Sequence, residues 1–243
     1  MTDDQLLQIL RDAADAVHES LATVTDWGPS GVRDGQYALD LVADAAALGI
    51  LRGAGLAVLS EESGLTGDGT LLVVVDPVDG STNASRGVPW YSTSLCVLDK
   101  DGPRIGLVHQ QVTGVRYEAI RGEGALRDGA PIRPTECREL GEAIVAVSGL
   151  PDHNAGWAQL RMFGAASLDI CAVAEGVVDA STVGGESTLY PWDYLGGLLL
   201  CTEAGAVAVD GGGQNLVSRR ADRRAPVVAA TPELLTSLVG AAV

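Results

Sequence analysis

Apolar residues recur at helical spacing over the first part of the chain. The positions that share this spacing are Leu6, Leu7, Leu10, Ala13, Ala14, Val17 and Leu21. Because one face of a helix collects such positions, the pattern predicts a first helix of about twenty residues. The glycine-rich stretch 25–35 then predicts a mobile loop, and a second helix is expected over 39–54, ending at Gly55.

Short apolar runs and alternating segments follow, and these patterns predict strands. Residues 56–59 form one short run, and residues 71–75 form a β-branched run that leads into Asp76. A continuous apolar run of this kind indicates a strand buried on both faces. Alternation and turn residues next predict an antiparallel meander. Its strands are expected over 92–98, 105–111 and 115–120.

The second half of the chain alternates between strand and helix patterns. Strands are expected over 143–147, 177–182, 206–209 and 227–230. Helices are expected over 167–175 and 192–204, and Pro232 opens the last one. This texture predicts an α/β fold, or α+β when the meander is included. Because repeats and Pro-rich linkers are missing, we expect two lobes, 1–140 and 141–243, with one active site between them.

Charge narrows the choice of partners. The chain of 243 residues carries 32 Asp and Glu against 16 Lys and Arg, a formal net charge of −16, and its one lysine is Lys100. Such a surface repels a phosphate backbone, so we expect no nucleic-acid partner.

The N-terminus has no signal-peptide pattern, and charges and glycines interrupt the longest apolar stretch, 43–59. We therefore expect a cytoplasmic protein without a membrane span.

Cysteine and histidine positions argue against a zinc site. The four cysteines (Cys96, Cys137, Cys171 and Cys201) are far apart, and the three histidines lie near no cysteine cluster. This spacing predicts reduced thiols rather than disulfides or metal ligands.

The segment 73–83 carries the most informative chemistry. Asp76 and Asp79 follow the buried run, with Pro77 between them and Gly80 directly after. Hydroxyls and exposed amides at the following helix start form an anion site. Carboxylates beside such a site need a cation between them, and all-oxygen ligation indicates Mg²⁺ or Mn²⁺.

Other acids in the sequence favour interpreting this segment as part of a metal site rather than as a structural turn. Taken alone, an Asp-x-x-Asp-Gly turn is more often structural. Glu61 and Glu62, however, lie at the end of the neighbouring predicted strand, and Asp193 opens a predicted helix. Acids at adjacent strand ends and a helix start can converge on one crevice, where they would repel each other unless metal ions bridged them.

Three separated motifs resemble those of the inositol monophosphatase family of lithium-sensitive sugar phosphatases. Residues 76–83 resemble its Asp-Pro-x-Asp-Gly-x-Thr-Asn signature, and residues 60–63 resemble its Gly-Glu-Glu-Ser element with Ser60 for the usual glycine. Residues 192–197 resemble its C-terminal Trp-Asp element, and the likeness runs from about residue 5 to about residue 240. The resemblance implies an α-β-α-β-α layered sandwich and a Mg²⁺-dependent phosphomonoesterase.

The resemblance also implies roles for individual residues. Two or three Mg²⁺ ions, with Mn²⁺ as an alternative, would be held by Glu61, Asp76, the Val78 carbonyl, Asp79 and Asp193. Gly80, Ser81 and Thr82 would bind phosphate through backbone amides, and Glu61, Asp79 and Ser81 would be catalytic. The Ser81 hydroxyl and Glu61 would orient and deprotonate the attacking water. Glu62 and Asp40 would lie behind the metal ligands, and the family's mobile loop corresponds to residues 25–35.

Substrate identity is where this chain departs from the family. The family's sugar-contacting glutamate aligns with Val183, because the stretch 184–190 carries about three extra residues. Glu186 is a candidate for that role, and the Ala166 amide is a second candidate substrate contact. Because arginines near the expected site are few (Arg86 and Arg161), a monophosphate is favoured over a bisphosphate.

Several functions stay open at this point. The default substrate is myo-inositol 1-phosphate. The alternatives are histidinol phosphate, fructose 1,6-bisphosphate or an adenosine 3′,5′-bisphosphate, and a non-catalytic, metal-stabilised binding protein is a different class. A small phosphorylated metabolite is the expected partner, and the resemblance implies a homodimer.

Overall fold

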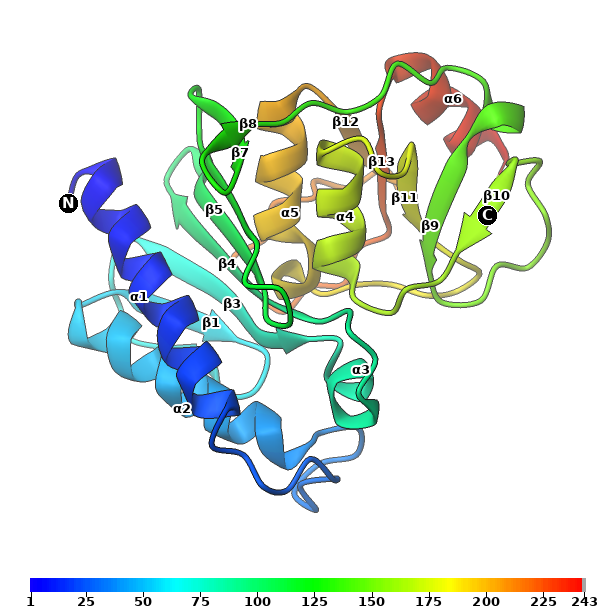
Figure 1. The fold of residues 1–243 in the computed structure, drawn as a ribbon. Helices are drawn as coiled ribbons and strands as arrows, with labels where there is room; N and C mark the ends of the chain where they lie inside the picture. The colour runs from blue at the N-terminus through cyan, green and yellow to red at the C-terminus, as the bar shows by residue number, and fades with distance from the viewer. Residues whose placement is uncertain (242–243) are drawn as a thin grey trace.

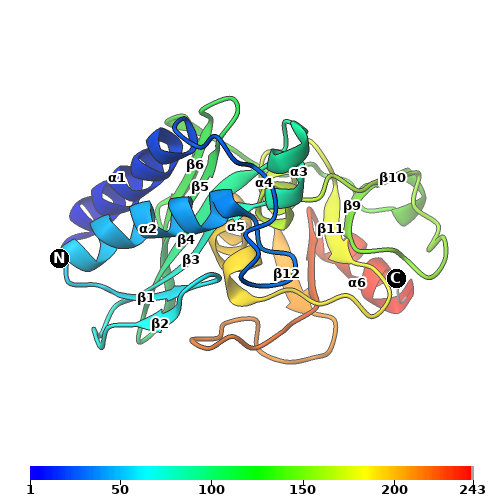
Figure 2. The ribbon, with the colours of Figure 1, turned by 90° about the horizontal axis from the view of Figure 1, so that it is seen from below.

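Five layers of alternating helices and sheets make up the computed structural model, which describes residues 1–241. Figure 1 shows helices α1 (Asp3–Leu21) and α2 (Ala38–Gly53) outside the first sheet, and α4 (Ala166–Ala174) and α5 (Pro191–Ala204) between the two sheets. Helix α6 (Pro232–Ala241) covers the outer face of the second sheet. The view from below shows the same succession (Figure 2). The α-β-α-β-α sandwich is therefore confirmed.

The first sheet has eight strands in the order β2-β1-β3-β4-β5-β6-β7-β8. Strands β1 and β3 are parallel, and the pairs from β3 to β8 are antiparallel. The strands are β1 (Ala57–Ser60), β2 (Gly64–Thr66), β3 (Leu72–Asp79), β4 (Ser92–Asp99), β5 (Gly102–Gln110), β6 (Arg116–Ile120), β7 (Gly124–Arg127) and β8 (Ala130–Pro131).

The second sheet has five strands in the order β10-β9-β11-β13-β12. They are β9 (Ile144–Ser148), β10 (Gln159–Arg161), β11 (Ala180–Val183), β12 (Val207–Asp210) and β13 (Pro226–Ala229). Helix α3 (Ser81–Arg86) and the 3₁₀ turn Leu140–Glu142 complete the described elements.

Burial explains why α4 and α5 occupy the middle layer. All nine residues of α4 are buried, and so are most residues of α5, whereas α1 buries only the apolar face that the sequence predicts. A helix that is apolar all round needs cover on every side, and two flanking sheets provide it.

Three expectations about strands need correction. The strand that leads into Asp76 does not stop there but continues through Asp79. The strand expected over 177–182 begins only at Ala180, because residues 175–179 turn out of α4. The strands β2, β7, β8 and β10 were not predicted, since runs of two to four residues carry too little periodicity.

Two smaller expectations can be compared directly with the described residues. All four cysteines are free thiols. Within residues 1–241, no helix combines the length and the apolar character that crossing a membrane requires.

Candidate metal centre

A β-bulge in β3 places its two aspartates on one side of the sheet. Asp76 pairs with Ser94 of β4, and Asp79 pairs with Ser92, so Pro77 and Val78 together face the single residue Thr93. In a regular strand, residues three apart point to opposite faces. The extra residue of the bulge corrects this, so Asp76 and Asp79 can serve one site.

Glu61 reaches the same site from the neighbouring strand. Ser60 at the end of β1 lies beside Val75 in parallel register, and the Glu61 amide donates to the Val75 carbonyl at 3.2 Å. This pairing holds Glu61 next to Asp76. The two acids therefore meet for the reason expected from the sequence, which is that parallel strands end at the same edge of a sheet.

Asp193 arrives from the first turn of α5. Its Oδ2 accepts the Tyr190 amide at 2.7 Å and so caps the helix, and among the described residues no group bonds Oδ1. The hydroxyl of Ser94, the β4 residue that pairs with Asp76, donates to the Trp192 carbonyl at 3.0 Å and so fixes this turn on the sheet.

Glu61, Asp76 and Asp193 form a compact carboxylate cluster. One oxygen from each lies within 4.8 Å of the others. Burial and the neighbouring acids raise the pKa of Glu61 to about 7, and the same causes raise the pKa values of Asp76 and Asp193 well above their usual range. Such crowding opposes ionisation, and a divalent cation would relieve it.

Asp79 lies beside this cluster and accepts hydrogen bonds from the start of α4. Its oxygens accept the Ala166 amide at 3.2 Å, the Ser167 amide at 2.7 Å and the Ser167 hydroxyl at 2.5 Å. Burial raises the pKa of Asp79 to about 6, and these hydrogen bonds oppose the increase. The Ala166 amide, a candidate substrate contact, is thus bound to Asp79 in this conformation, and its substrate role stays a prediction.

The turn after Asp79 presents free amides. Because the Ala84 amide donates to the Gly80 carbonyl, the amides of Ser81, Thr82 and Asn83 belong to the unpaired first turn of α3. Gly80 has φ +88°, and a Cβ there would lie 3.0 Å from the Ala165 Cβ and 3.1 Å from two carbonyl oxygens. Glycine is therefore required where this turn packs against the segment that precedes α4.

Glu62 and Asp40 belong to the outer part of the site. Glu62 does not join the cluster, because it pairs with Arg33 at 2.9 Å and with Gln36, both from the loop that leads to α2. Asp40 accepts the Tyr37 amide at 2.9 Å, and its second oxygen is buried with no hydrogen-bond partner in residues 1–241. Burial raises the pKa of Asp40 to about 7.

Two open cavities border the acids. One of about 370 Å³ is lined by Arg33, Asp34, Glu61, Tyr190 and Trp192, among others. The other, of about 400 Å³, lies at Asp79 and Asp193. Its further lining is Asn83, Val147, Ser148, Gly149, Met162, Phe163, Gly164, Ala166 and Leu189. Glu186 is exposed in the turn after β11 and lines neither cavity, so its proposed contact with substrate stays a prediction.

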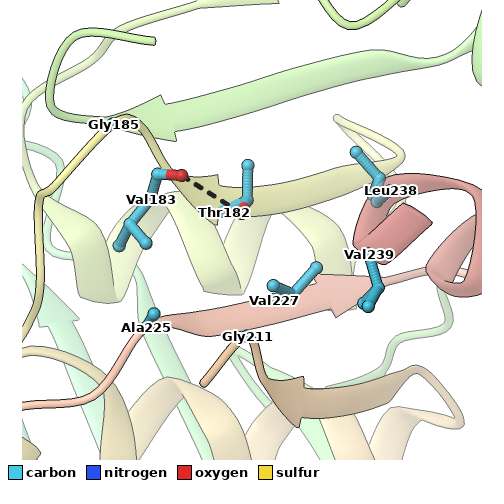
Figure 3. A pocket seen from close by; sticks show the side chains of 8 residues that line it. All are labelled: Thr182, Val183, Gly185, Gly211, Ala225, Val227, Leu238 and Val239. Atoms are coloured by element: carbon cyan, nitrogen blue, oxygen red, sulfur yellow. Dashed lines mark hydrogen bonds between the residues drawn. The ribbon is translucent and has the colours of Figure 1, made fainter. Parts of the chain in front are cut away.

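A third cavity, of about 230 Å³, lies between β11, β13 and α6 (Figure 3). Thr182, Val183, Val227, Leu238 and Val239 line most of it, and none of its lining residues is acidic or basic. Without titratable groups or metal ligands it is not a candidate catalytic site.

Two hydrogen-bonded pairs near the site are not predicted from the sequence. The Ser60 hydroxyl donates to Asp44 and accepts the Glu62 amide at 3.2 Å, which gives the departure from the family's glycine a structural role. The Trp90 indole donates to Asp169 of α4 at 2.9 Å. In the sequence, Asp44 and Asp169 each stand out only as an acid within an apolar helical pattern. That pattern does not reveal the hydrogen-bond partner of either acid.

Comparison with known proteins agrees with this geometry. The model of the inositol monophosphatase family matches residues 51–243. The chain belongs to the inositol monophosphatase family. A fructose-1,6-bisphosphatase/inositol-1-monophosphatase of Archaeoglobus fulgidus is 32% identical over 251 residues, covering 98% of both chains. A putative Nus factor SuhB of Neisseria meningitidis is 33% identical over 199 residues, covering 75% of this chain and 73% of that protein.

Solved structures have the same fold. An extragenic suppressor from Pyrococcus furiosus superposes with a TM-score of 0.85 at 25% identity, covering 98% of this chain and all of that one. The inositol monophosphatase from Anabaena gives a TM-score of 0.82 at 25% identity, with coverages of 98% and 95%. Membership of this family makes the chain a phosphatase, a phosphoric monoester hydrolase.

Proposed function

We propose that the chain is a Mg²⁺-dependent phosphomonoesterase acting on a small alcohol or sugar monophosphate. The observation that carries this proposal is the cluster of Glu61, Asp76 and Asp193, whose oxygens approach within 4.8 Å. The cluster lies next to the free amides of α3 and to the 400 Å³ cavity, which Asp193 also lines.

The donor set suits magnesium. The groups available are carboxylates and the Val78 carbonyl, and oxygen-only sets favour Mg²⁺ or Mn²⁺ over zinc. We propose that Glu61, Asp76, the Val78 carbonyl, Asp79 and Asp193 hold two or three ions. Asp79 can do so while bound to α4, because its Oδ1 accepts only the Ala166 amide and keeps a second lone pair, whereas Oδ2 accepts both bonds from Ser167. The bound ions would neutralise the phosphate and stabilise the leaving oxygen.

The chain's own residues would then position the reactants. The amides of Gly80, Ser81 and Thr82 would hold the phosphate oxygens, and the side chains of Ser81 and Glu61 would orient the attacking water and take its proton. Arg33 and Gln36, bound to Glu62, would fix the loop beside the 370 Å³ cavity. Support comes from the family motif and from the placement of these groups around one crevice.

The cavity at Asp79 and Asp193 favours one phosphate per substrate. Its lining contains no lysine or arginine, and Val147, Met162, Phe163 and Leu189 form much of its wall. Arg161 does not line this cavity, and its guanidinium donates to the Leu160 carbonyl at 2.9 Å and to Gln159. A second phosphate would lack a basic partner here. We take myo-inositol 1-phosphate as the default, with histidinol phosphate, fructose 1,6-bisphosphate and adenosine 3′,5′-bisphosphate as alternatives.

Relatives named Nus factor SuhB favour a second candidate function, a Nus-factor role. The net charge of −16 argues against direct contact with nucleic acid in either role. We further propose a cytoplasmic homodimer with the active site between lobes 1–140 and 141–243.

Phosphate release from a panel of these compounds, with Mg²⁺ and with chelator, tests the proposal. We expect Mg²⁺-dependent, lithium-sensitive turnover concentrated on a monophosphate. Asp193→Asn should lower turnover by about 100-fold or more, because it removes a charged ligand while its carbonyl oxygen can still cap α5. Undiminished turnover by this variant would contradict the metal assignment. No release from any compound, despite Mg²⁺ binding, would favour the binding-protein alternative.

A further inference from the structure

The bulge in β3 leaves one backbone carbonyl without a regular ladder partner. Pro77 lies between the two aspartates, and Pro77 and Val78 face the single residue Thr93 of β4. The Thr93 hydroxyl takes the place of the missing partner by donating to the Pro77 carbonyl at 2.8 Å. On the other side, Asp76 accepts the Val78 amide at 3.0 Å. The Pro77–Val78 peptide is thus held from both ends.

Thr93 is the inner end of a longer chain of side chains. Gln111, which follows β5, donates from Nε2 to the Thr93 hydroxyl at 2.8 Å. Its other amide atom, Oε1, lies 2.9 Å from Nδ1 of His18 on α1. Thr93 is fully buried and Gln111 is 4% exposed, while His18 lies at the surface. Residues 93 apart in sequence thereby connect the outer helical layer to the metal-binding strand.

Chemistry fixes the direction of every bond in this chain. A carbonyl can only accept, so the Thr93 hydroxyl donates to Pro77 and must accept from Gln111. The Gln111 NH₂ group therefore faces Thr93, and its oxygen faces His18. His18 must then carry a proton on Nδ1, which both the imidazolium and the Nδ1–H tautomer provide. All three bonds point inward and polarise one another.

We infer that Thr93 and Gln111 are positioning residues that hold the bulge in the shape the metal ligands need, and that His18 ties them to α1. The inference rests on the proposed Mg²⁺-dependent function. Asp76, the Val78 carbonyl and Asp79 all flank the Pro77 carbonyl in sequence, so a rotation of this peptide would move three proposed ligands together. Groups that orient metal ligands commonly change metal affinity by 10–100-fold when lost.

The experiment is a calorimetric titration of the substrate-free protein with Mg²⁺ alone, paired with turnover as a function of Mg²⁺. Thr93→Val removes the hydroxyl at nearly constant volume, and we expect a Mg²⁺ dissociation constant raised about 10-fold. The turnover number at saturating Mg²⁺ should stay within about threefold of wild type, because no reacting group is lost. Thr93→Ser keeps the hydroxyl and should restore the affinity.

Thr182→Val is the matched control. It makes the same change at a buried threonine of β11, whose hydroxyl bonds only the Val183 carbonyl, at 3.4 Å, and no proposed metal ligand among the described residues. Wild-type Mg²⁺ affinity in Thr93→Val, or an equal loss in Thr93→Val and Thr182→Val, would overturn the inference. Failure of the wild-type protein itself to bind Mg²⁺ would overturn the proposed function, and the inference with it.

Three further variants test the other residues of this hydrogen-bond chain and guard against a Thr93→Val protein that fails to fold. Gln111→Leu should weaken Mg²⁺ binding in the same direction as Thr93→Val. His18→Ala should weaken Mg²⁺ binding less than Gln111→Leu does. His18→Asn should keep the wild-type Mg²⁺ affinity, because an asparagine amide can donate from the position of Nδ1. Wild-type Mg²⁺ affinity in Gln111→Leu would contradict the proposed role of the hydrogen bond from Gln111 to Thr93.

Discussion

Asp169 shows how a single buried acid can make stability depend on pH. It is fully buried in α4; its Oδ1 accepts the Trp90 indole N–H, and its Oδ2 has no partner within the described residues. Burial raises the pKa of Asp169 to about 8. A raised carboxyl pKa means that the folded state prefers the neutral form, whereas the unfolded chain ionises near pH 4.

The sign of the effect follows directly. The stability that Asp169 contributes is fully present below about pH 4 and is lost as the pH rises through about 8. Asp169→Asn keeps a neutral side chain that can still accept from Trp90. We expect its melting temperature to match wild type at or below about pH 4, and to exceed it increasingly as the pH rises, by several degrees at pH 8 to 9. A difference independent of pH, measured by calorimetry at matched ionic strength, would contradict the assignment.

Among the elements, α5 depends most on close packing against the first sheet. A Cβ at Gly106 of β5 would lie 2.8 Å from the Gly196 carbonyl of α5, which is backbone and cannot rotate away. The same helix carries Asp193 in its first turn. The distance between helix and sheet is therefore coupled to the position of a proposed metal ligand.

Gly106→Ala should push α5 away from the sheet. We expect a loss of about 1–3 kcal/mol from overpacking, together with weaker Mg²⁺ binding. Gly49→Ala on α2 is the matched control, because a Cβ there meets nothing within 4 Å and alanine favours the helix by about 0.5–1 kcal/mol. Denaturant unfolding measures the free energy of unfolding of both variants. A Gly106→Ala protein as stable as wild type would show that the contact is not tight.

Over the whole molecule, the excess of negative charge competes with its ion pairs. Within residues 1–241 nine ion pairs form, and most join partly exposed side chains, whose individual contributions are small. The net charge of −16 acts against compactness throughout the chain. The repulsion between negative charges should therefore destabilise the folded state more than the ion pairs stabilise it.

Added salt separates the two effects. In the presence of chelator, we expect the melting temperature to rise by several degrees between about 50 mM and about 500 mM NaCl, because salt screens the repulsion. The same series at saturating Mg²⁺ should show a smaller increase, since the carboxylate cluster is then neutralised. A melting temperature that falls with NaCl would mean that the ion pairs dominate.

Local patterns determined a large part of this protein. The apolar periodicity of residues 6–21 and of 39–54 placed the first two helices, because a helix needs only its own stripe of apolar positions to be recognised. The motifs at Glu61, Asp76–Asn83 and Asp193 identified the family and named the acids that the fold brings together. Short edge strands escaped prediction, since their positions depend on neighbours rather than on their own residues.

Only the tertiary structure decided how those acids are held. Asp76 and Asp79 share one face because the register of β3 against β4 skips a residue, which no spacing in β3 alone reveals. Asp79 binds the start of α4, 87 and 88 residues away, and Thr93 reaches His18 through Gln111. Hydrogen bonds across such separations depend on sheet order and helix placement. The sequence therefore named the proposed metal ligands, and the packed fold determined which groups hold them in place.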